Sequence, residues 1–186
     1  TTEKRKHDHI ELFFGNLILR FHDPRRFGSF TWTDHSPYEH KLLKSLGAEP
    51  LEKCFDGAYL YRKTRNRRGH IKSLIMNAKI VVGVGNIYAN ESLFEAGIHP
   101  HRQANRISLK RYSRLAQKIK DVLWESILSG GTTLRDFYDK DGNPGYFKTK
   151  LKVYGKEGQP CSACARPIKH IVTGQRATYY CSHCQR

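Results

Sequence analysis

Apolar residues fall on every second position over residues 9–22, on both sides of a Gly15-Asn16 pair. A period of two is typical of β-strands, and Gly-Asn suits the tight turn between two of them. The pattern therefore predicts a β-hairpin, and residues 30–32 (Phe-Thr-Trp) predict a further strand. Because two or three strands cannot bury the apolar face of their sheet alone, we expect them to be partial β-sandwich strands that require a second sheet.

From Ser36 onwards the apolar spacing becomes helical. Ser36 is a suitable N-cap before Pro37, and the leucines at 42, 43 and 46 would form one apolar stripe that ends at Gly47. Similar signals predict four later helices: one capped by Asp56, a short one that includes Ile71 and Ile75, one from a cap at Asn86 to about Ala96, and the longest from a cap at Ser108 to about Leu128.

The predicted elements divide the chain into three parts. A turn-rich stretch over residues 139–145 separates the longest helix from a predicted strand over residues 146–154. We therefore expect an α+β fold. Residues 1–34 would be the remnant of an N-terminal β-sandwich domain, residues 35–145 a helical domain, and residues 146–186 a C-terminal β-hairpin.

The charge of the chain narrows its possible partners. Lysine and arginine total 33 against 17 acidic residues, which gives a net charge of +16. Such an excess is typical of nucleic-acid-binding proteins, although a generically basic protein would also have it. No stretch approaches about eighteen apolar residues and no signal peptide is visible, so we expect neither a membrane span nor secretion.

Four of the five cysteines form two Cys-x-x-Cys pairs that are separated by sixteen residues: Cys161, Cys164, Cys181 and Cys184. This spacing is typical of a tetrahedral structural zinc, with two disulfides as the alternative. Because all four positions are cysteine, no ligand position is left for a catalytic water, and a zinc hydrolase is disfavoured. We expect His183 to be a neighbour of the metal and Cys54 to be partly buried and uninvolved.

Residues 173–176 (Thr-Gly-Gln-Arg), between the two cysteine pairs, predict the tip of a hairpin. A zinc ion would hold its two strands together and present Arg176 rigidly. In a chain with such an excess of positive charge, we expect that arginine to meet a polyanion.

Two further segments are candidates for phosphate binding. Residues 83–86 (Gly-Val-Gly-Asn) precede a predicted helix, where glycines allow an anion to approach exposed amides at the positive end of the helix dipole. A run of Arg and Lys at positions 62, 63, 65, 67, 68 and 72 lies nearby in sequence and would extend that surface. Ordinary turn chemistry and a solvated charged face are the simpler interpretations of each segment alone.

Residues 23–28 (Asp-Pro-Arg-Arg-Phe-Gly) place two arginines and an aromatic ring on one loop. Such side chains can enter a DNA duplex and stack on a base. Taken alone, the segment is more simply interpreted as a loop with an inward-packed Phe27 and solvated arginines.

Three motifs, in this order, resemble the formamidopyrimidine-DNA glycosylase family, the helix–two-turns–helix DNA glycosylases that include endonuclease VIII. They are residues 23–28, residues 82–89 with 91–94 (Val-Gly-Val-Gly-Asn-Ile-Tyr-Ala and Glu-Ser-Leu-Phe), and residues 174–178 (Gly-Gln-Arg-Ala-Thr). The resemblance covers essentially the whole chain. It implies that the helices at Asn86 and Ser108 form the helix–two-turns–helix module. Residues 141–147 resemble the loop that closes over an everted oxidised purine, which favours the formamidopyrimidine branch.

The resemblance also implies roles for individual residues. Asn86 and Arg176 would bind the phosphate that flanks the lesion, and Arg176 would be the proton donor in the final elimination. Lys72 would add a phosphate contact.

Four more residues fall on family positions that contact DNA. Arg25 and Phe27 would fill the gap left by the flipped nucleotide and probe the opposite base. The resemblance further assigns DNA binding to His7 and Arg67.

One part of the family pattern is missing. The family's nucleophile is an N-terminal proline followed by glutamate, with a lysine and a void-filling methionine further on, whereas residue 1 here is Thr. That amine attacks the sugar C1′ and forms the Schiff base that permits strand cleavage. We therefore expect a chain that begins at Thr1 to be inactive alone and to be the remainder of a longer protein.

These observations predict a bifunctional glycosylase and abasic-site lyase that removes the oxidised purines 8-oxoguanine and formamidopyrimidine from damaged double-stranded DNA. We expect a monomeric, cytoplasmic bacterial protein with one structural zinc and no nucleotide cofactor. The alternatives are a non-catalytic zinc-dependent DNA-binding module, an endonuclease VIII-like enzyme for oxidised pyrimidines, and a zinc-ribbon protein that binds RNA.

Overall fold

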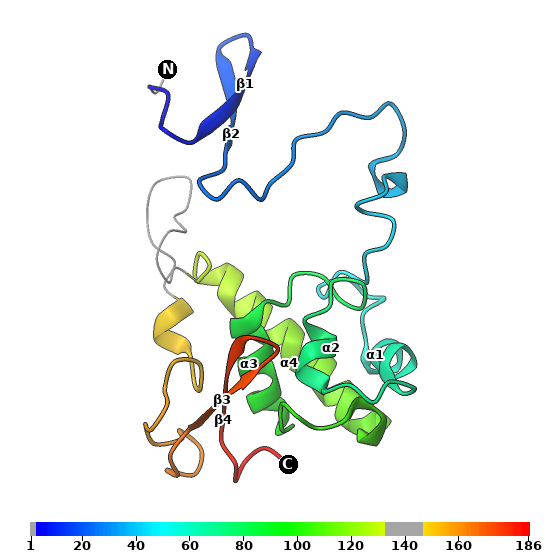
Figure 1. The fold of residues 1–186 in the computed structure, drawn as a ribbon, viewed down its shortest axis with the longest axis vertical. Coiled ribbons are helices and arrows are strands. Elements are labelled where there is room, and N and C mark those ends of the chain that lie inside the picture. Colours follow the sequence, from blue (N-terminus) through cyan, green and yellow to red (C-terminus); the bar gives the residue numbers. More distant parts are fainter. Residues whose placement is uncertain (1–2, 133–146) are drawn as a thin grey trace. The chain divides into compact units, whose positions relative to one another are not determined.

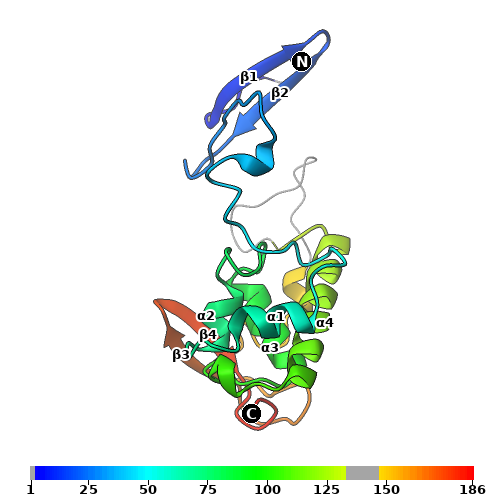
Figure 2. The same ribbon diagram turned by 90° about the vertical axis from the view of Figure 1, so that its right-hand side faces the viewer.

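The structure, a computed structural model, describes residues 3–132 and 147–186. The chain divides into two compact units, Thr1–Lys44 and Ser45–Arg186, whose elements are drawn in Figures 1 and 2. Helices and strands both occur, as an α+β fold requires. None of the helices within the described ranges combines the length and the apolar character needed to cross a lipid bilayer.

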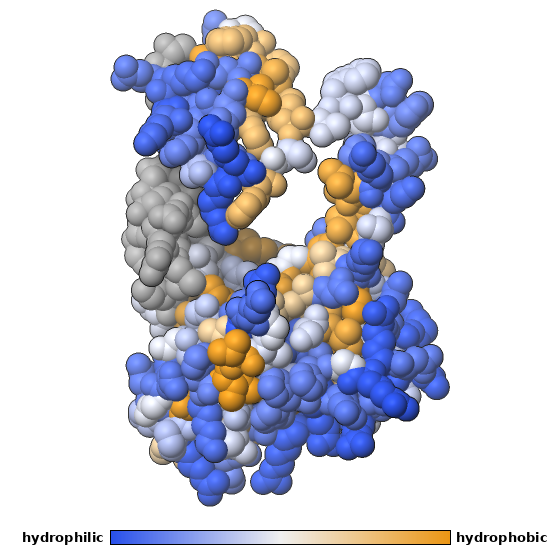
Figure 3. Space-filling model, in the orientation of Figure 1, coloured by the Kyte–Doolittle hydropathy of each residue, from blue (hydrophilic) through white to orange (hydrophobic). Residues whose placement is uncertain are grey.

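The first unit contains the predicted hairpin. Strands β1 (Asp8–Phe14) and β2 (Leu17–His22) are antiparallel and joined by a turn in which Gly15 has a φ of 57°. Glycine adopts that left-handed conformation without a steric penalty. Much of the apolar surface of the hairpin is exposed, including Phe13, Phe14, Leu17 and Leu19. Figure 3 shows an orange apolar patch over this hairpin.

Two elements predicted for residues 30–46 do not form. Residues 30–32 are not a strand, and the Phe30 ring instead packs on Phe21 with the ring centroids 5.9 Å apart. The helix predicted from Pro37 is reduced to one 3-10 turn, η1 (Pro37–Glu39), without a side-chain cap. Its leucine stripe is exposed, and a short helix that buries no apolar face is marginal in water.

The second unit has, in its described residues, four α-helices around one core. They are α1 (Gly57–Thr64), α2 (Ile71–Ile75), α3 (Asn86–Ala96) and α4 (Leu109–Leu128), with a 3-10 turn, η2 (Ala104–Arg106), before α4. Helix α4 packs against α1 and α3 (Figure 2). The side chains of Asp56 and Ser108 cap α1 and α4, as predicted.

The core of this unit is apolar, and its buried tyrosine is satisfied. Tyr112 of α4 is fully buried, and its hydroxyl accepts a hydrogen bond from Thr64 and donates one to the Ala104 carbonyl. Other side chains with no exposed surface include Phe55, Leu60, Ile75, Leu93 and Ile119. Cys54, expected to be partly buried, is exposed.

A second hairpin follows near the C-terminus. Strands β3 (Lys169–Thr173) and β4 (Arg176–Tyr180) are antiparallel, and β4 packs against α3 (Figure 1). Phe94 of α3 shares a small apolar cluster with Val153 and Ile168, which joins the hairpin segment to the helices. The hairpin is therefore anchored on α3.

The strand predicted over residues 146–154 is wrong. The described part forms a 3-10 turn, η3 (Phe147–Lys150), and then a loop. The reason is a buried carboxylate on α3. Glu91 accepts hydrogen bonds from the amides of residues 152, 153 and 154, at 2.8 to 3.0 Å. These amides are satisfied by a side chain, so the segment needs no partner strand.

Candidate metal centre and nucleic-acid interface

The four predicted ligands lie together beside the second hairpin. The Sγ atoms of Cys161, Cys164, Cys181 and Cys184 are all within 4.8 Å of one another. The Cys161–Cys184 distance is 3.9 Å and the Cys164–Cys181 distance is 3.5 Å. A tetrahedral zinc with Zn–S bonds of about 2.3 Å holds its sulfurs about 3.8 Å apart, whereas a disulfide bond is about 2.05 Å long. The cluster therefore fits one structural zinc and not two disulfides.

The tip of the hairpin presents Arg176. Gly174 and Gln175 have φ values of 53° and 60°, so both residues of the two-residue turn are left-handed. This is the turn geometry that matches the twist of the flanking strands. Arg176 is the first residue of β4, paired with Thr173, and it is exposed.

The N-terminus of α3 lies next to this tip. Gly85 is the N-cap of α3, and Asn86, predicted as the cap, is the first helical residue. The Asn86 side chain instead faces β4, where its Nδ2 donates to the Ala177 carbonyl at 3.0 Å. Beyond their chain neighbours, no described atom lies within 4 Å of the position that a Cβ on Gly83 or Gly85 would take. An anion can therefore approach the first amides of α3.

Asn90, one helical turn after Asn86, is a functional candidate that sequence reasoning misses. Its Oδ1 accepts the Tyr179 amide at 2.7 Å, and its Nδ2 donates to the Asn86 carbonyl at 2.7 Å. The two asparagine side chains thus form hydrogen bonds with the backbone carbonyl of Ala177 and the backbone amide of Tyr179, as a neighbouring strand would. Their spacing of four residues on one helix face is the signal that could have revealed the pair.

Lys72 of α2 lies behind the hairpin tip. It is 1% exposed, and its Nζ donates to the Ala177 carbonyl at 2.9 Å and to the Thr178 hydroxyl at 2.6 Å. Burial, with a smaller contribution from the charge of Arg176, lowers the pKa of Lys72 to about 8. The predicted phosphate ligand is therefore a buried cation that supports β4, close enough to Arg176 for the two charges to repel.

A polar chain continues from Lys72 to a group of histidines. The Thr178 hydroxyl donates to that of Thr173 at 3.0 Å, and Thr173 Oγ1 is 2.6 Å from His101 Nε2. The His101 ring stacks on His70, with centroids 4.3 Å apart. Burial, and then the charge of His70, lower the pKa of both His99 and His101. The neutral rings are therefore favoured where the hairpin meets the loop after α3.

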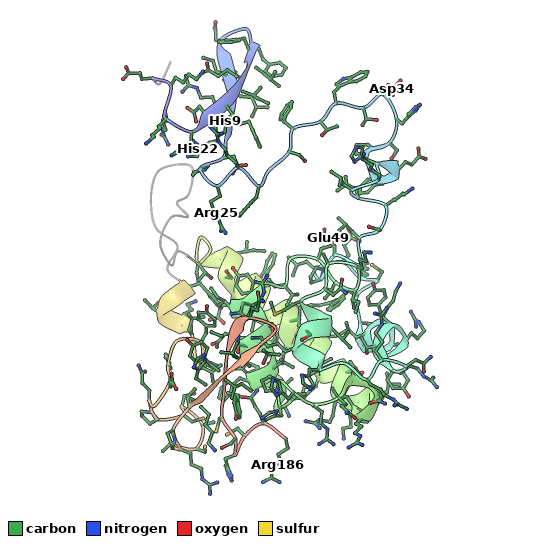
Figure 4. All side chains as sticks on the ribbon, viewed as in Figure 1. His9, His22, Arg25, Asp34, Glu49 and Arg186 are labelled. Carbon is green, nitrogen blue, oxygen red and sulfur yellow. The ribbon has the colours of Figure 1, made fainter. Side chains whose placement is uncertain are left out.

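The other predicted DNA contacts lie elsewhere. In the first unit Phe27 is 82% exposed, and the Arg25 guanidinium, labelled in Figure 4, lies 5.1 Å from its ring centroid. The inward-packed interpretation of Phe27 is therefore wrong. The His7 ring lies 6.1 Å from that of His22. Arg67, in the second unit, is exposed and donates to the Lys63 carbonyl.

The predicted lesion-covering loop, residues 141–147, lies outside the described residues except for its last member. Phe147 is 3% exposed, and its ring centroid is 6.0 Å from that of Tyr88 on α3. Among the predicted site residues, the structure brings Lys72 and Asn86 together at the Ala177 carbonyl, next to Arg176 at the hairpin tip.

Comparison with known proteins identifies the family. A family model described as the formamidopyrimidine-DNA glycosylase H2TH domain matches residues 46–138, and one for the zinc finger found in FPG and IleRS matches residues 158–186. The formamidopyrimidine-DNA glycosylase of Methylococcus capsulatus is 57% identical over 183 residues, which are 98% of this chain and 68% of that protein. The chain belongs to the formamidopyrimidine-DNA glycosylase family.

Other members agree. The formamidopyrimidine-DNA glycosylase of Nitrosococcus oceani is 55% identical over 185 residues, 99% of this chain and 68% of that protein. The solved MutM (Fpg) protein of Thermus thermophilus is similar to this chain with a TM-score of 0.88 at 38% sequence identity. The match includes 98% of this chain and 70% of the Thermus protein. The Lactococcus lactis protein, solved with DNA containing an abasic site, has a TM-score of 0.84 at 34% sequence identity. This match includes 100% of this chain and 68% of the Lactococcus protein.

The family assignment completes the account of the metal centre. The matched zinc-finger family model and the four clustered thiols together identify one structural zinc in this member of the family. The predicted family and fold class are both confirmed.

Proposed function

We propose that this chain is the DNA-holding part of a bifunctional glycosylase that excises 8-oxoguanine and formamidopyrimidines from damaged double-stranded DNA and then cuts the abasic site. The names of the relatives support the glycosylase activity. The substrate class is supported by two solved complexes of the Lactococcus lactis protein, one with DNA that contains Fapy-dG and one with DNA that contains an abasic site.

The observation that carries the proposal is the hydrogen bond from Asn86 to the Ala177 carbonyl. It holds the open N-terminus of α3 and the residue next to Arg176 on the same side of the second unit. A helix N-terminus and an arginine are both phosphate ligands. The α3 N-terminus and Arg176, held near each other by this hydrogen bond, suit adjacent phosphates of a kinked DNA strand.

Each residue then has a proposed role. Asn86 and Arg176 contact the phosphate beside the lesion, with Lys72 adding positive charge from behind β4. Because an extruded base leaves a gap in the stack, Arg25 and Phe27 fill that gap. The remaining DNA contacts of the proposal are His7 and Arg67.

The chemistry requires an amine nucleophile. In the family's reaction, attack of the N-terminal proline on C1′ displaces the base and forms a Schiff base, and elimination then breaks the two phosphate ester bonds. Arg176 would supply a proton in the final elimination. The roles that we propose for residues 1–186 are DNA binding and this proton donation, and none of these residues is proposed as the nucleophile.

The three parts proposed from the sequence, residues 1–34, 35–145 and 146–186, correspond to a sandwich remnant, a helix–two-turns–helix domain and a zinc hairpin. We further propose that the protein works as a monomer in the bacterial cytoplasm, without a nucleotide cofactor.

Two measurements test this function. Fluorescence anisotropy at fixed salt compares a duplex with a tetrahydrofuran abasic analogue, the same duplex undamaged, and a structured RNA, since affinities depend on salt. We expect the abasic duplex to bind most tightly, and equal binding of all three would contradict the proposal. Borohydride should trap no covalent adduct of this chain, whereas an adduct would show that another amine replaces the proline.

The alternative is a zinc-dependent DNA-binding module with no chemistry, because all four residues of the metal cluster are cysteines and leave no ligand position for a catalytic water. Fusing an upstream Pro-Glu segment from a relative tests it. Gain of cleavage at 8-oxoguanine supports the glycosylase, cleavage at oxidised pyrimidines alone supports an endonuclease VIII-like enzyme, and no cleavage of either supports the module.

A further inference from the structure

A cavity of about 940 Å³ opens at the C-terminal end of α3, away from Asn86. Its walls come from the last turn of α3, the first turns of α4 and the two cysteine loops. Since α3 has 11 residues, this end lies roughly 16 Å along the helix axis from the proposed phosphate site. The cavity is therefore separate from the DNA interface proposed above.

The cavity is lined by five cationic side chains, Lys110, Arg111, Arg114, Lys152 and Arg186. Glu95 is the one carboxylate side chain among its lining residues, and Lys152 already pairs with it. The lining therefore carries a strong excess of positive charge. Such an excess attracts an anionic partner.

Two of the cations, Arg111 and Arg114, bind backbone carbonyls, which partly explains their presence in the lining. Arg111 donates to the carbonyls of Gly97 and Arg186, at 2.9 and 2.6 Å, and Arg114 donates to the Glu95 carbonyl at 3.0 Å. Cations at the C-terminus of a helix are stabilised by its dipole. Burial, followed by the charges of Arg102 and Arg114, nevertheless lowers the pKa of Arg111. The cations around Arg111 therefore repel one another.

The other two cations have no such role. Within residues 3–132 and 147–186, the Lys110 ammonium and the Arg186 guanidinium make no hydrogen bond or ion pair. Arg186 is labelled at the lower end of Figure 4. Both charges line the cavity and are free to meet a ligand.

The interior of the cavity selects among anions. Ala163 of the first cysteine loop contributes exposed apolar surface, whereas Phe94 and Ala96 of α3 are only 8% and 4% exposed. A volume of about 940 Å³ far exceeds one inorganic ion and lies in the range of an organic ligand pocket. An acidic peptide combines carboxylates for the cations with an apolar side chain for Ala163, whereas a single inorganic anion would leave most of the volume unfilled.

We propose that the cavity docks an acidic segment of a partner protein, with its carboxylates on Lys110, Arg111, Arg114 and Arg186 and an apolar side chain against Ala163. Arginine clusters recognise acidic motifs in this way, often through two parallel hydrogen bonds to one carboxylate. The segment binds the far end of α3 while the hairpin tip is free for DNA. The site thus links a repair protein to another protein without competition for the damaged strand.

The test uses a short fluorescein-labelled peptide rich in Asp and Glu with one Phe, and a matched peptide in which Asn and Gln replace the acids. The site variant is Lys110→Glu/Arg186→Glu, because these substitutions break no side-chain bond in the described structure. The matched control is Lys44→Glu/Lys53→Glu, which reverses two exposed charges outside the cavity. Retention of zinc and of the thermal midpoint checks that each variant is folded.

We expect the acidic peptide to bind more weakly as salt rises, and its affinity to fall roughly tenfold or more in the site variant and about twofold or less in the control. Affinity for the abasic duplex should fall equally in both variants. Three results would overturn the proposal: equal loss of peptide binding in the two variants, equal binding of the uncharged peptide, or displacement of the peptide by one equivalent of duplex. The last would assign the cavity to nucleic acid.

Discussion

The side-chain amide of Asn86 and the carbonyl oxygen of Ala177 are 3.0 Å apart, although 91 positions separate the two residues in sequence. Lys72 donates to the same oxygen at 2.9 Å. Both lone pairs of this carbonyl are thus in use, and helices α2 and α3 meet strand β4 at one atom. The hairpin cannot slide along α3 without losing both bonds, so Arg176 is held at a fixed position relative to the α3 N-terminus.

Asn90 should be a second clamp on the same strand. In Asn90→Leu the buried Tyr179 amide loses its acceptor, which costs about 1–3 kcal/mol. We expect roughly tenfold or faster hydrogen exchange of the Tyr179 amide and about tenfold weaker binding to the abasic duplex.

Asn90→Asp is the matched control, because it keeps an oxygen for the Tyr179 amide and loses the donor to the Asn86 carbonyl. It should retain most of the affinity. Faster exchange in Asn90→Leu with unchanged DNA binding would separate the clamp from recognition and disprove this prediction.

Zinc should be needed for the hairpin and not for the helices. Chelation, or Cys161→Ser, removes a tetrahedral ligand set on which the small apolar cluster around Val153 and Ile168 depends. We expect binding to the abasic duplex to be lost, while the helical circular dichroism signal changes little. Cys54→Ser, a change at an exposed cysteine outside the cluster, is the control and should have no effect. Unchanged DNA binding after verified zinc loss would refute the presenting role of the hairpin.

Arg176→Ala should weaken binding to the abasic duplex by about 2–3 kcal/mol, the scale of one lost charge-assisted contact. Stability should hardly change, since the Arg176 side chain is exposed. Lys169→Ala, an exposed cation on β3 of the same hairpin, is the comparison and should cost well under about 1 kcal/mol. Similar losses in both variants would mean that only the overall charge matters.

Glu91→Ala should unfold the approach to the zinc hairpin. Three backbone amides would lose their acceptor in a buried site, and we expect a loss of about 3 kcal/mol in the free energy of unfolding. Glu95→Ala, on the same helix, removes a partly exposed ion pair with Lys152 and should cost less than about 1 kcal/mol. Equal losses in a urea titration would show that the amides find other partners.

Local signals predicted the elements that are stabilised locally or by burial. The caps at Asp56 and Ser108, the end of a helix near Ala96 and the turn at residues 173–176 all form as expected. The cysteine spacing predicted the metal site because two Cys-x-x-Cys turns typically supply the four thiolate ligands of a structural zinc.

Other features depend on groups far apart in the sequence. The leucines at 42, 43 and 46 have a helical spacing, yet all three side chains are exposed in the described part of the chain. The residues before Tyr154 have a strand-like sequence, yet the Glu91 carboxylate accepts the hydrogen bonds of the amides of residues 152–154. The burial of Lys72 under β4 has no sequence signal, because a lysine in a basic run is normally solvated.

The buried position of Lys72 predicts a pH dependence of DNA binding. Its pKa is about 8 in the folded protein against 10.5 for an ordinary lysine. Between these values the unfolded chain binds more protons, so this group makes stability rise with pH. A phosphate beside Arg176 would raise the pKa of Lys72 again, so the complex binds more protons than the free protein. Affinity for the abasic duplex should therefore fall as pH rises above about 8, by at most about tenfold per pH unit. Anisotropy titrations from about pH 7 to about pH 9.5 measure this slope, and the non-titrating variant Lys72→Gln should lose it. The same slope in both proteins would assign the effect to another group.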